Sequence, residues 1–200
     1  MRQKPDKYYD LAIVDPPYGM RGNTFQLKNK KFTKGHSSAK LDKNNSKIGL
    51  SLSAPPGKKY FDELFRISKN QIVFGMQYFT KYLPSRQCVI VWDKMNGANY
   101  FSDAEIAWTS FDTAVRLARI HNPPNNRIHP TQKTVKLYRW ILQNYAKSGD
   151  KIIDTHGGSM TIAIAADIEG FDLDICEINK EYFDAGVKQF NDHKLQLTLF

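Results

Sequence analysis

An acidic residue, two prolines and a tyrosine follow an apolar segment near the start of the chain. The run Tyr8–Val14 has the pattern of a buried strand, and Asp15-Pro16-Pro17-Tyr18 comes directly after it. Open α/β sheets bind ligands at the carboxyl ends of their strands, and proline fixes φ and lacks an N–H. A carboxylate, a prolyl carbonyl and an aromatic face would suit a planar ring with an exocyclic amine. The plainer interpretation is a strand followed by a proline-rich turn and a packed tyrosine.

A second set of residues has the form of a strand, a glycine turn and a helix start. Ile152-Ile153-Asp154 leads into Thr155-His156-Gly157-Gly158-Ser159, and Glu177 follows the next strand, 23 residues after Asp154. Glycines let the backbone approach a ligand, and a helix N-terminus offers unpaired N–H groups. An acid at about that distance binds ribose hydroxyls in Rossmann-like sheets. Taken alone, the set also fits a dinucleotide dehydrogenase or an ordinary βαβ unit with a tight turn.

The apolar periodicity predicts the elements that position these two sets. Strands alternate with helices, which implies an α/β fold with a Rossmann-like, mainly parallel sheet and helices on both faces. Residues 104–111 and 114–120 are predicted to close the sheet as an antiparallel edge pair. The other predicted strands are residues 8–14, 71–74, 88–92, 151–154 and 172–178. The predicted helices are residues 59–67, 77–83, 132–147 (with Thr131 as N-cap), 160–168 and 180–191.

Composition favours a cytoplasmic globular protein. The 200 residues are 41% hydrophobic, enough for one domain over residues 1–192 with a tail at 193–200. No apolar run approaches the roughly 20 residues of a membrane span, and the N-terminus lacks the pattern of a signal peptide. Cys88 and Cys176 each lie in an apolar segment, which predicts buried free thiols in a reducing cytosol. No His/Cys spacing predicts a metal site.

The net charge of +9 is concentrated in one segment. Residues 21–59 hold ten Lys or Arg and one acid, Asp42, so the rest of the chain is balanced. Residues 19–58 are rich in Gly, Ser, Asn and Lys without an apolar period, which predicts a long, basic, mobile loop. Because the loop adjoins the proposed ring-binding residues, phosphate contacts are favoured over a solvated face. The candidate phosphate-binding residues are Lys28, Lys30, Lys31 and Lys34.

Several separated motifs occur together in a recognisable order. The chain resembles the β-class DNA amino-methyltransferases from about residue 8 to residue 190. In that family the catalytic tetrapeptide precedes the cofactor half, a circularly permuted order of the class I methyltransferase fold. The motifs that carry the resemblance are Asp15–Tyr18, Trp92-Asp93-Lys94, Phe101–Glu105, His129-Pro130-Thr131-Gln132-Lys133, Gly149-Asp150, Asp154, Gly157-Gly158-Ser159 and Glu177.

The resemblance implies S-adenosylmethionine as cofactor. Its methionine portion would be held near Asp154 and the following turn, and its ribose by Glu177. The cofactor residues carried over are Asp15, Thr131, Lys133, Asp154, Thr155, Gly157, Gly158, Ser159 and Glu177. Two positions depart from the family pattern, because Thr134 stands in place of a proline and Met160 in place of a glycine. Met160 lies where the helix start would pack near the cofactor, so cofactor affinity could be altered there.

The implied reaction is methyl transfer to the N6 amine of an adenine flipped out of double-stranded DNA, with Asp15, Pro16, Pro17 and Tyr18 as catalytic residues. An aspartate at the first position favours adenine by family habit. The alternatives are N4-cytosine methylation, a catalytically silent DNA-binding or assembly protein of the same fold, and an RNA substrate. The recognition sequence is not determined, and a homodimer is left open. Sequence recognition would come from loop 19–58, from loop 93–103 or from a second subunit.

The C-terminus ends in an apolar pattern after a polar stretch. Gln196, Leu197, Leu199 and Phe200 resemble the pentapeptide by which bacterial DNA-processing proteins dock on the replication sliding clamp. The alternative is that this tail folds back and buries its side chains against the core.

Overall fold

The computed structural model describes residues 1–19, 54–96, 102–122, 128–129 and 131–197. It divides into two compact units, one made of residues 1–16 and 57–200 and the other of residues 17–56. Most of the predicted basic loop 19–58, with its four candidate lysines, lies outside the described residues, and so do the last three residues of the chain. The larger unit contains every strand and helix described below.

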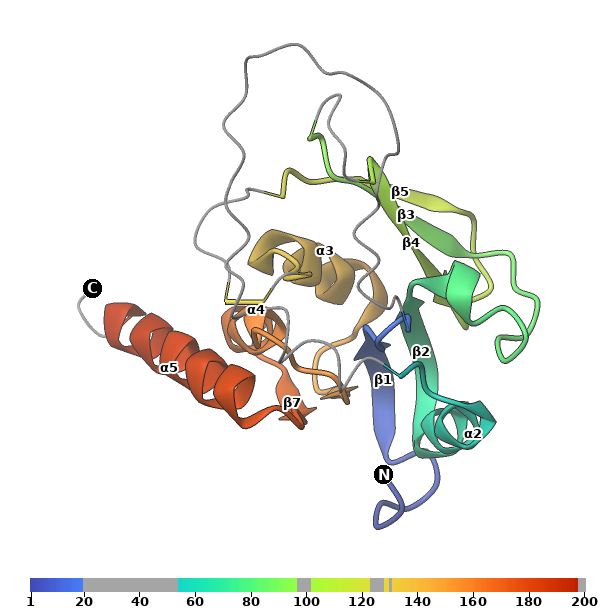
Figure 1. Ribbon diagram of the computed structural model, residues 1–200, viewed down its shortest axis with the longest axis horizontal. Helices are drawn as coiled ribbons and strands as arrows, with labels where there is room; N and C mark the ends of the chain where they lie inside the picture. The colour runs from blue at the N-terminus through green and yellow to red at the C-terminus, as the bar shows by residue number, and fades with distance from the viewer. Residues whose placement is uncertain (20–53, 97–101, 123–127, 130, 198–200) are drawn as a thin grey trace, which may run out of the picture. The chain divides into compact units, whose positions relative to one another are not determined.

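A seven-stranded sheet organises the described part of the larger unit (Figure 1). The strand order is β5-β3-β4-β2-β1-β6-β7. β4 runs antiparallel to both of its neighbours, and all other neighbouring pairs are parallel. The predicted mainly parallel α/β sheet is therefore confirmed. The strands are β1 Tyr9–Val14, β2 Ser68–Phe74, β3 Val89–Asp93, β4 Ala104–Thr109, β5 Arg116–Arg119, β6 Lys151–Asp154 and β7 Asp172–Ile175.

The pairing of β4 and β5 differs from the predicted closing pair. The two strands run in opposite directions, but β3 lies between them, and β5 pairs in parallel with β3 from Ile90↔Arg116 to Asp93↔Arg119. Strands that follow one another in sequence are adjacent in only about two thirds of cases. Here β4 fills the gap between β2 and β3, so β5 reaches the sheet only at its outer edge.

The helices lie near the predicted positions, but several begin or end at residues other than the predicted ones. The segment predicted as a helix at 77–83 contains only the short 3₁₀ helix η1, Met76–Tyr78, and the last helix runs on to Leu197. The predicted N-cap Thr131 is wrong, because Thr134 caps α3 by accepting a hydrogen bond from the N–H of Leu137. The helices are α2 Lys58–Ile67, α3 Val135–Tyr145, α4 Thr161–Glu169 and α5 Lys180–Leu197.

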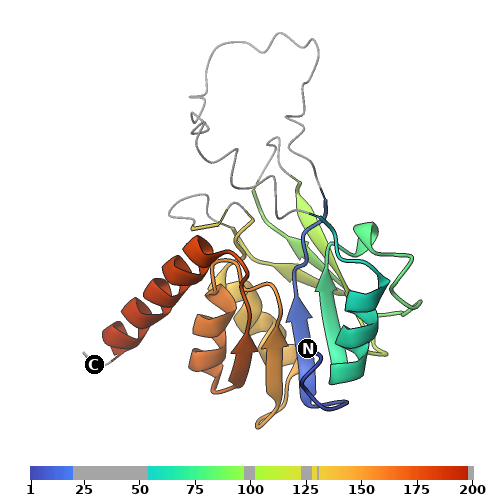
Figure 2. The ribbon, with the colours of Figure 1, turned by 60° about the horizontal axis from the view of Figure 1, so that its bottom comes forward.

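Helices cover the sheet on both faces (Figures 1 and 2). On one face, alternate residues of β1 such as Leu11 and Ile13 join a buried cluster with Leu137 and Ile141 of α3 and Ile162 of α4. α2 lies on the other face and buries the side chains of its inner stripe. That stripe consists of Phe61, Leu64 and Ile67. This two-sided burial explains why β1 reads as a nearly continuous apolar run.

The two cysteines differ in their surroundings. Both are free thiols, but Cys88 is buried whereas Cys176 is exposed. The predicted burial of Cys176 is therefore wrong. Cys176 directly follows β7, the edge strand of the sheet, where alternate side chains face solvent. None of the helices described is both long and apolar enough to span a bilayer.

Candidate active site

Asp15 directly follows β1, the strand in the middle of the parallel part of the sheet. Its carboxylate Oδ2 accepts a short hydrogen bond from the ammonium Nζ of Lys133, just before α3. The Lys133 side chain is almost wholly buried, and that of Asp15 is 15% exposed. Pro16, which follows, is buried. The sequence thus delivers a carboxylate and a fixed prolyl carbonyl to the carboxyl edge of the sheet.

Lys133 is shared between two carboxylates. Its Nζ also lies 3.3 Å from Oε2 of Glu105 in β4, and Nζ of Lys94 lies 2.8 Å from Oε1 of the same glutamate. Burial opposes the charge on Lys133, but Asp15 and Glu105 outweigh it and raise the pKa of the ammonium. Burial likewise opposes the charge on Glu105, but Lys133 and Lys94 hold the pKa of its carboxyl below the usual value. Lys133 and Glu105 are therefore both charged at neutral pH.

Asp154 ends β6 at the same edge and is 1% exposed. Its Oδ1 accepts the backbone N–H of His156 at 2.9 Å. Burial raises the pKa of its carboxyl to about 7, and the nearby negative charge of Asp15 adds to the effect. A buried carboxylate of this kind favours a positively charged ligand, because such a ligand would relieve the cost of ionisation.

Thr155 and His156 join the turn to α2. The hydroxyl of Tyr60 in α2 lies 2.7 Å from Oγ1 of Thr155, which is 3.0 Å from Nδ1 of His156. Burial lowers the pKa of His156 to about 4, so the imidazole is neutral at pH 7. Burial also raises the pKa of Tyr60. These neutral side chains hold the first half of the turn without adding charge.

The glycines of the turn are required by their surroundings. A Cβ on Gly157 would lie 2.8 Å from Cγ1 of Ile175 and 3.3 Å from the carbonyl oxygen of Cys176, and Gly158 has φ +51°. The N–H of Gly158 donates to Oε2 of Glu177 at 2.8 Å, and Oε1 of Glu177 accepts the N–H of Asn179. Glu177 is therefore held against the turn by two backbone donors.

Ser159 and Met160 lead from the turn into α4. Ser159 is buried, and Met160 has φ +56°, a left-handed conformation that favours the family's glycine over a side chain. The buried Met160 side chain packs against α5, where a Cβ on Gly186 would lie 2.7 Å from Cγ of Met160. The departure from the family pattern at Met160 is thus accommodated by a missing side chain on the neighbouring helix.

Thr131 contacts His129. Its Oγ1 is 3.1 Å from Nδ1 of His129, whose ring packs edge-on against Tyr182 at 4.5 Å between centroids. The ring of His129 also lies beside Gly158. These contacts place the segment before α3 next to the glycine turn.

The larger unit therefore gathers Asp15, Pro16 and the predicted cofactor residues at one edge of the sheet. Pro17 and Tyr18 belong to the second compact unit, and the four lysines lie outside the described residues. The sequence patterns assign no role to Lys94, Glu105, Tyr60, His129 or His156. Lys94 and Glu105 do stand in two of the segments that carry the family resemblance, and this is the signal that could have found them. Among the described side chains, no cluster of three or more His, Cys, Asp or Glu could hold a metal ion.

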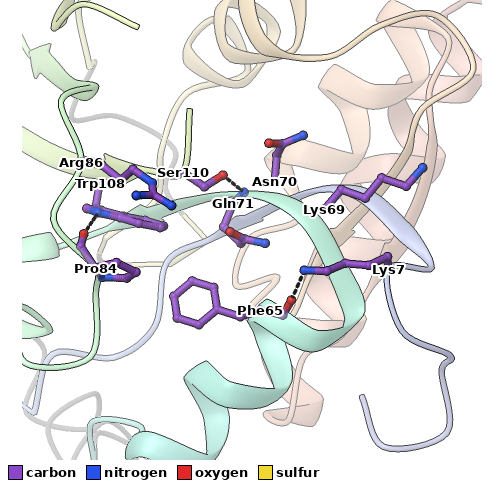
Figure 3. A pocket seen from close by; sticks show the side chains of 9 residues that line it. All are labelled: Lys7, Phe65, Lys69, Asn70, Gln71, Pro84, Arg86, Trp108 and Ser110. Atoms are coloured by element: carbon purple, nitrogen blue, oxygen red, sulfur yellow. Dashed lines mark hydrogen bonds between the residues drawn. The ribbon is translucent and has the colours of Figure 1, made fainter. Parts of the chain in front are cut away.

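A separate pocket of about 290 Å³ lies at the opposite edge of the sheet (Figure 3). It is lined by the start of β2 and the end of β4, including Gln71 and Trp108. Two of its polar groups are already engaged, because the Trp108 indole donates to the carbonyl of Pro84 and the Lys7 ammonium donates to that of Phe65. We therefore assign the chemistry to the carboxyl edge.

Comparisons with known proteins identify a sequence family and related folds. The sequence family described as DNA methylase, of the N6/N4 methyltransferase type, matches residues 28–188, more than three quarters of the chain. The match includes Lys133, Asp154 and Glu177 and begins after the tetrapeptide. No curated protein matches the sequence at a significant level.

Solved structures of DNA methyltransferases share the fold. The complex of M1.HpyAVI with SAM has a TM-score of 0.57 at 16% identity and covers 92% of this chain and 90% of its own. The cytosine-N4-specific PvuII DNA methyltransferase has a TM-score of 0.57 at 15% identity, covering 96% and 86%. A putative DNA modification methylase from Thermus thermophilus, complexed with S-adenosyl-L-methionine, has a TM-score of 0.56 at 13% identity, covering 96% and 90%.

Proposed function

The chain belongs to the N6/N4 DNA methylase family, and we propose that it transfers a methyl group from S-adenosylmethionine to the N6 amine of adenine in double-stranded DNA. The observation that carries the proposal is the buried contact between Asp15 and Lys133. It fixes a carboxylate at the sheet edge that also holds Asp154 and the glycine turn. Two of the structural neighbours, M1.HpyAVI and the Thermus protein, are complexes with this cofactor.

The residues at the carboxyl edge fit this cofactor. Asp154 offers a buried carboxylate to its ammonium, and the turn that follows it carries Gly157 and Gly158. Glu177 uses each carboxylate oxygen once for a backbone N–H, and the remaining lone pairs can accept the two ribose hydroxyls. When bound, the cofactor supplies an electrophilic methyl group on a sulfonium sulfur. Thr131, Thr155 and Ser159 complete the set that we assign to it, and the family resemblance adds Asp15 and Lys133.

Asp15 and Pro16 bind the target amine in this proposal. The amine is a weak nucleophile because its lone pair is delocalised into the ring. Hydrogen bonds from its two N–H groups to the Asp15 carboxylate and the Pro16 carbonyl favour a pyramidal nitrogen and stabilise the positive charge that develops on it. The departing proton passes to Asp15 or to water. Tyr18 stacks on the base, which must leave the duplex to reach these groups, and Pro17 fixes the turn between them.

Product analysis tests both the activity and the target base. Purified protein is incubated with duplex DNA and labelled S-adenosylmethionine, and the digested DNA is separated into nucleosides. Label in N6-methyldeoxyadenosine supports the proposal, whereas label in N4-methyldeoxycytidine selects the cytosine alternative, which the fold shared with the PvuII enzyme keeps in view. An absence of label with cofactor binding retained would favour a silent DNA-binding protein. RNA and DNA duplexes are compared in parallel, and methylation-sensitive sequencing of DNA from an expressing strain identifies the site.

The basic segment provides the first quantitative prediction. Replacing Lys28, Lys30, Lys31 and Lys34 by Gln is expected to weaken DNA binding and to flatten its salt dependence, by about 0.9 unit of log–log slope for each phosphate that is no longer neutralised. Cofactor binding should stay unchanged. The measurement is the DNA dissociation constant between low and moderate salt. An unchanged slope would show that these lysines are only a solvated face.

The C-terminal residues provide a second prediction. We propose that Gln196, Leu197, Leu199 and Phe200 dock on the replication sliding clamp, and that the chain can form a homodimer. Gln196 and Leu197 end α5, and the other two residues lie outside the described part. Pull-down of purified clamp by the full chain should succeed, and the double variant Leu199→Ala/Phe200→Ala should lose it. Equal capture by both proteins, or by neither, rejects the clamp. Sedimentation with and without DNA tests the dimer.

A further inference from the structure

Four side chains of alternating charge form a continuous row that starts at Asp15. Lys133 contacts Asp15 and lies 3.3 Å from Glu105, which in turn lies 2.8 Å from Lys94. We call Asp15, Lys133, Glu105 and Lys94 the charge row. The side chains of its last two members are 22% and 13% exposed, so the row is largely shielded from water. Charges at such distances in a shielded site interact strongly.

The charge row joins four parts of the fold at the carboxyl edge of the sheet. Asp15 follows β1, Lys133 precedes α3, Glu105 lies in β4 and Lys94 follows β3. Aromatic rings support both cations, because Nζ of Lys133 lies 4.4 Å from the centre of the Phe74 ring and Nζ of Lys94 lies 5.6 Å from that of Trp92. Glu105 lies within a strand, and the other three charged residues each lie within two residues of the end of a strand or helix.

One carboxylate oxygen of Glu105 lacks a hydrogen bond within the described part of the chain. Its Oε2 is buried and makes no hydrogen bond among the described residues, although the Lys133 ammonium is within ion-pair distance. Native proteins satisfy most buried polar atoms, so such an oxygen calls for a reason. Lys133 already has Asp15 as a partner. A second carboxylate is therefore not needed to neutralise Lys133. With Glu105 present, the one ammonium interacts with two carboxylates and not with Asp15 alone.

Building on the proposed function, we infer that Lys133 and Glu105 are positioning residues for Asp15. Lys133 pairs with the Asp15 carboxylate and holds it in one orientation. Glu105 competes for the same ammonium, so that Asp15 is not drawn wholly into an ion pair and stays a strong acceptor for the target amine. The family resemblance assigns Lys133 to the cofactor, whereas its contacts here lead to the catalytic carboxylate and to Glu105.

The two residues should act on Asp15 in opposite directions. Without the Lys133 cation the carboxylate binds a proton more readily, so the acidic limb of the kcat profile moves to higher pH. Without the Glu105 anion the carboxylate loses a proton more readily, so the limb moves to lower pH. A single ion pair is expected to cause shifts of about 1 to 3 pH units. The other titratable groups that act on Asp15, or on which it acts, are Asp154, His156, His129, Tyr60 and Tyr138.

The test uses Lys133→Met, Glu105→Gln and the control Glu169→Gln. The Glu169 side chain is 16% exposed, close to the 22% of Glu105, and it forms a 2.6 Å ion pair with Arg139 of α3. It differs from Glu105 in lying at the far end of α4. For each variant, kcat, KM for cofactor and DNA, and the pH profile of kcat are measured, with the melting temperature as a fold control. The Asp15 carboxyl is titrated by carbon-13 NMR in the cofactor-free protein and assigned from its loss in Asp15→Asn.

The expected result is a fall in kcat of about 10- to 100-fold for Glu105→Gln and more for Lys133→Met, with KM for cofactor changed less than about threefold. The acidic limb and the carboxyl titration should move in opposite directions in these two variants, while Glu169→Gln matches wild type. Equal behaviour of Glu105→Gln and Glu169→Gln overturns the inference and leaves the methyltransferase function standing. If wild type transfers no methyl group, the proposed function fails instead, and the NMR titration alone then decides whether Lys133 and Glu105 control Asp15. Should Lys133→Met not fold, Glu105→Gln carries the test, because it leaves Lys133 paired with Asp15.

Discussion

Replacement of Asp15 by Asn is expected to lower the rate of methyl transfer by about 100- to 1,000-fold, because removal of one preorganised electrostatic contact to a developing charge has an effect of that size. Asparagine has the same shape but is uncharged, and its amide hydrogens would face either Lys133 or the target amine. Lys133 keeps Glu105 within ion-pair distance, so the fold should survive. Single-turnover transfer to DNA gives the rate, and calorimetry gives the cofactor affinity.

This variant separates target binding from cofactor binding. If Asp15 acts on the amine, the cofactor dissociation constant should change by less than about threefold while the transfer rate collapses. Turnover close to that of wild type would remove Asp15 from the mechanism. A defect confined to cofactor affinity would move it to the cofactor set, in which the family resemblance also counts it.

Replacement of Asp154 by Asn is expected to stabilise the free protein and to weaken cofactor binding together. The burial of Asp154 makes its ionised form costly and raises its pKa to about 7. Asparagine keeps an oxygen that can accept the His156 N–H and carries no charge. The loss of a charged partner for the cofactor should weaken binding by about 10- to 100-fold, as for a hydrogen bond to a charged group. Calorimetric titration with S-adenosylmethionine measures the affinity.

The stability gain should depend on pH in a defined direction. The folded protein keeps the Asp154 proton up to about pH 7, whereas the unfolded chain releases it near the usual pKa of 3.8 for this carboxyl. The folded state therefore binds more protons than the unfolded chain in this window. The contribution of Asp154 to wild-type stability falls as pH rises from about 4 to 7. The Asn variant lacks this loss. Its free energy of unfolding should therefore exceed that of wild type by about 1–4 kcal/mol above pH 7 and match it near pH 4. Denaturant unfolding at pH 4.5 and pH 8 measures both proteins.

Cofactor binding to the wild-type protein should depend on the same Asp154 proton. A cationic ligand prefers ionised Asp154, so binding below about pH 7 must release a proton, and the affinity should fall up to about tenfold per pH unit. Calorimetry in buffers of different ionisation enthalpy measures the released proton directly. A dissociation constant that does not vary between pH 5.5 and pH 8 would contradict a charged contact at Asp154.

The features that the sequence predicts correctly rest on local patterns. β1 is buried on both faces and therefore reads as an apolar run that ends at Asp15. β6 and the turn after it combine an apolar strand with Gly157 and Gly158, where a side chain would collide or a positive φ is needed. Because both strands are parallel neighbours in the sheet, their ends meet at one edge without further information.

The features that the sequence does not predict depend on contacts between distant segments. Glu105 reaches Lys133 only because β4 inserts antiparallel between β2 and β3, a pairing that no local pattern encodes. Thr131 and Thr134 are equally good caps by composition, and only the structure shows that Thr134 accepts the Leu137 N–H. The Cys176 segment alternates acidic and apolar residues whereas that of Cys88 is continuously apolar, and the position of β7 at the sheet edge exposes Cys176.

The contact between Met160 and Gly186 implies that the two positions share a fixed volume. Met160 occupies a left-handed backbone position at the start of α4, and its side chain fills the space that a side chain on Gly186 of α5 would take. A relative with glycine at the first position leaves that space empty, so its second position can carry a larger side chain. Close homologues of this chain should therefore show reciprocal changes in size at the two sites, as expected where an interior packs at constant density.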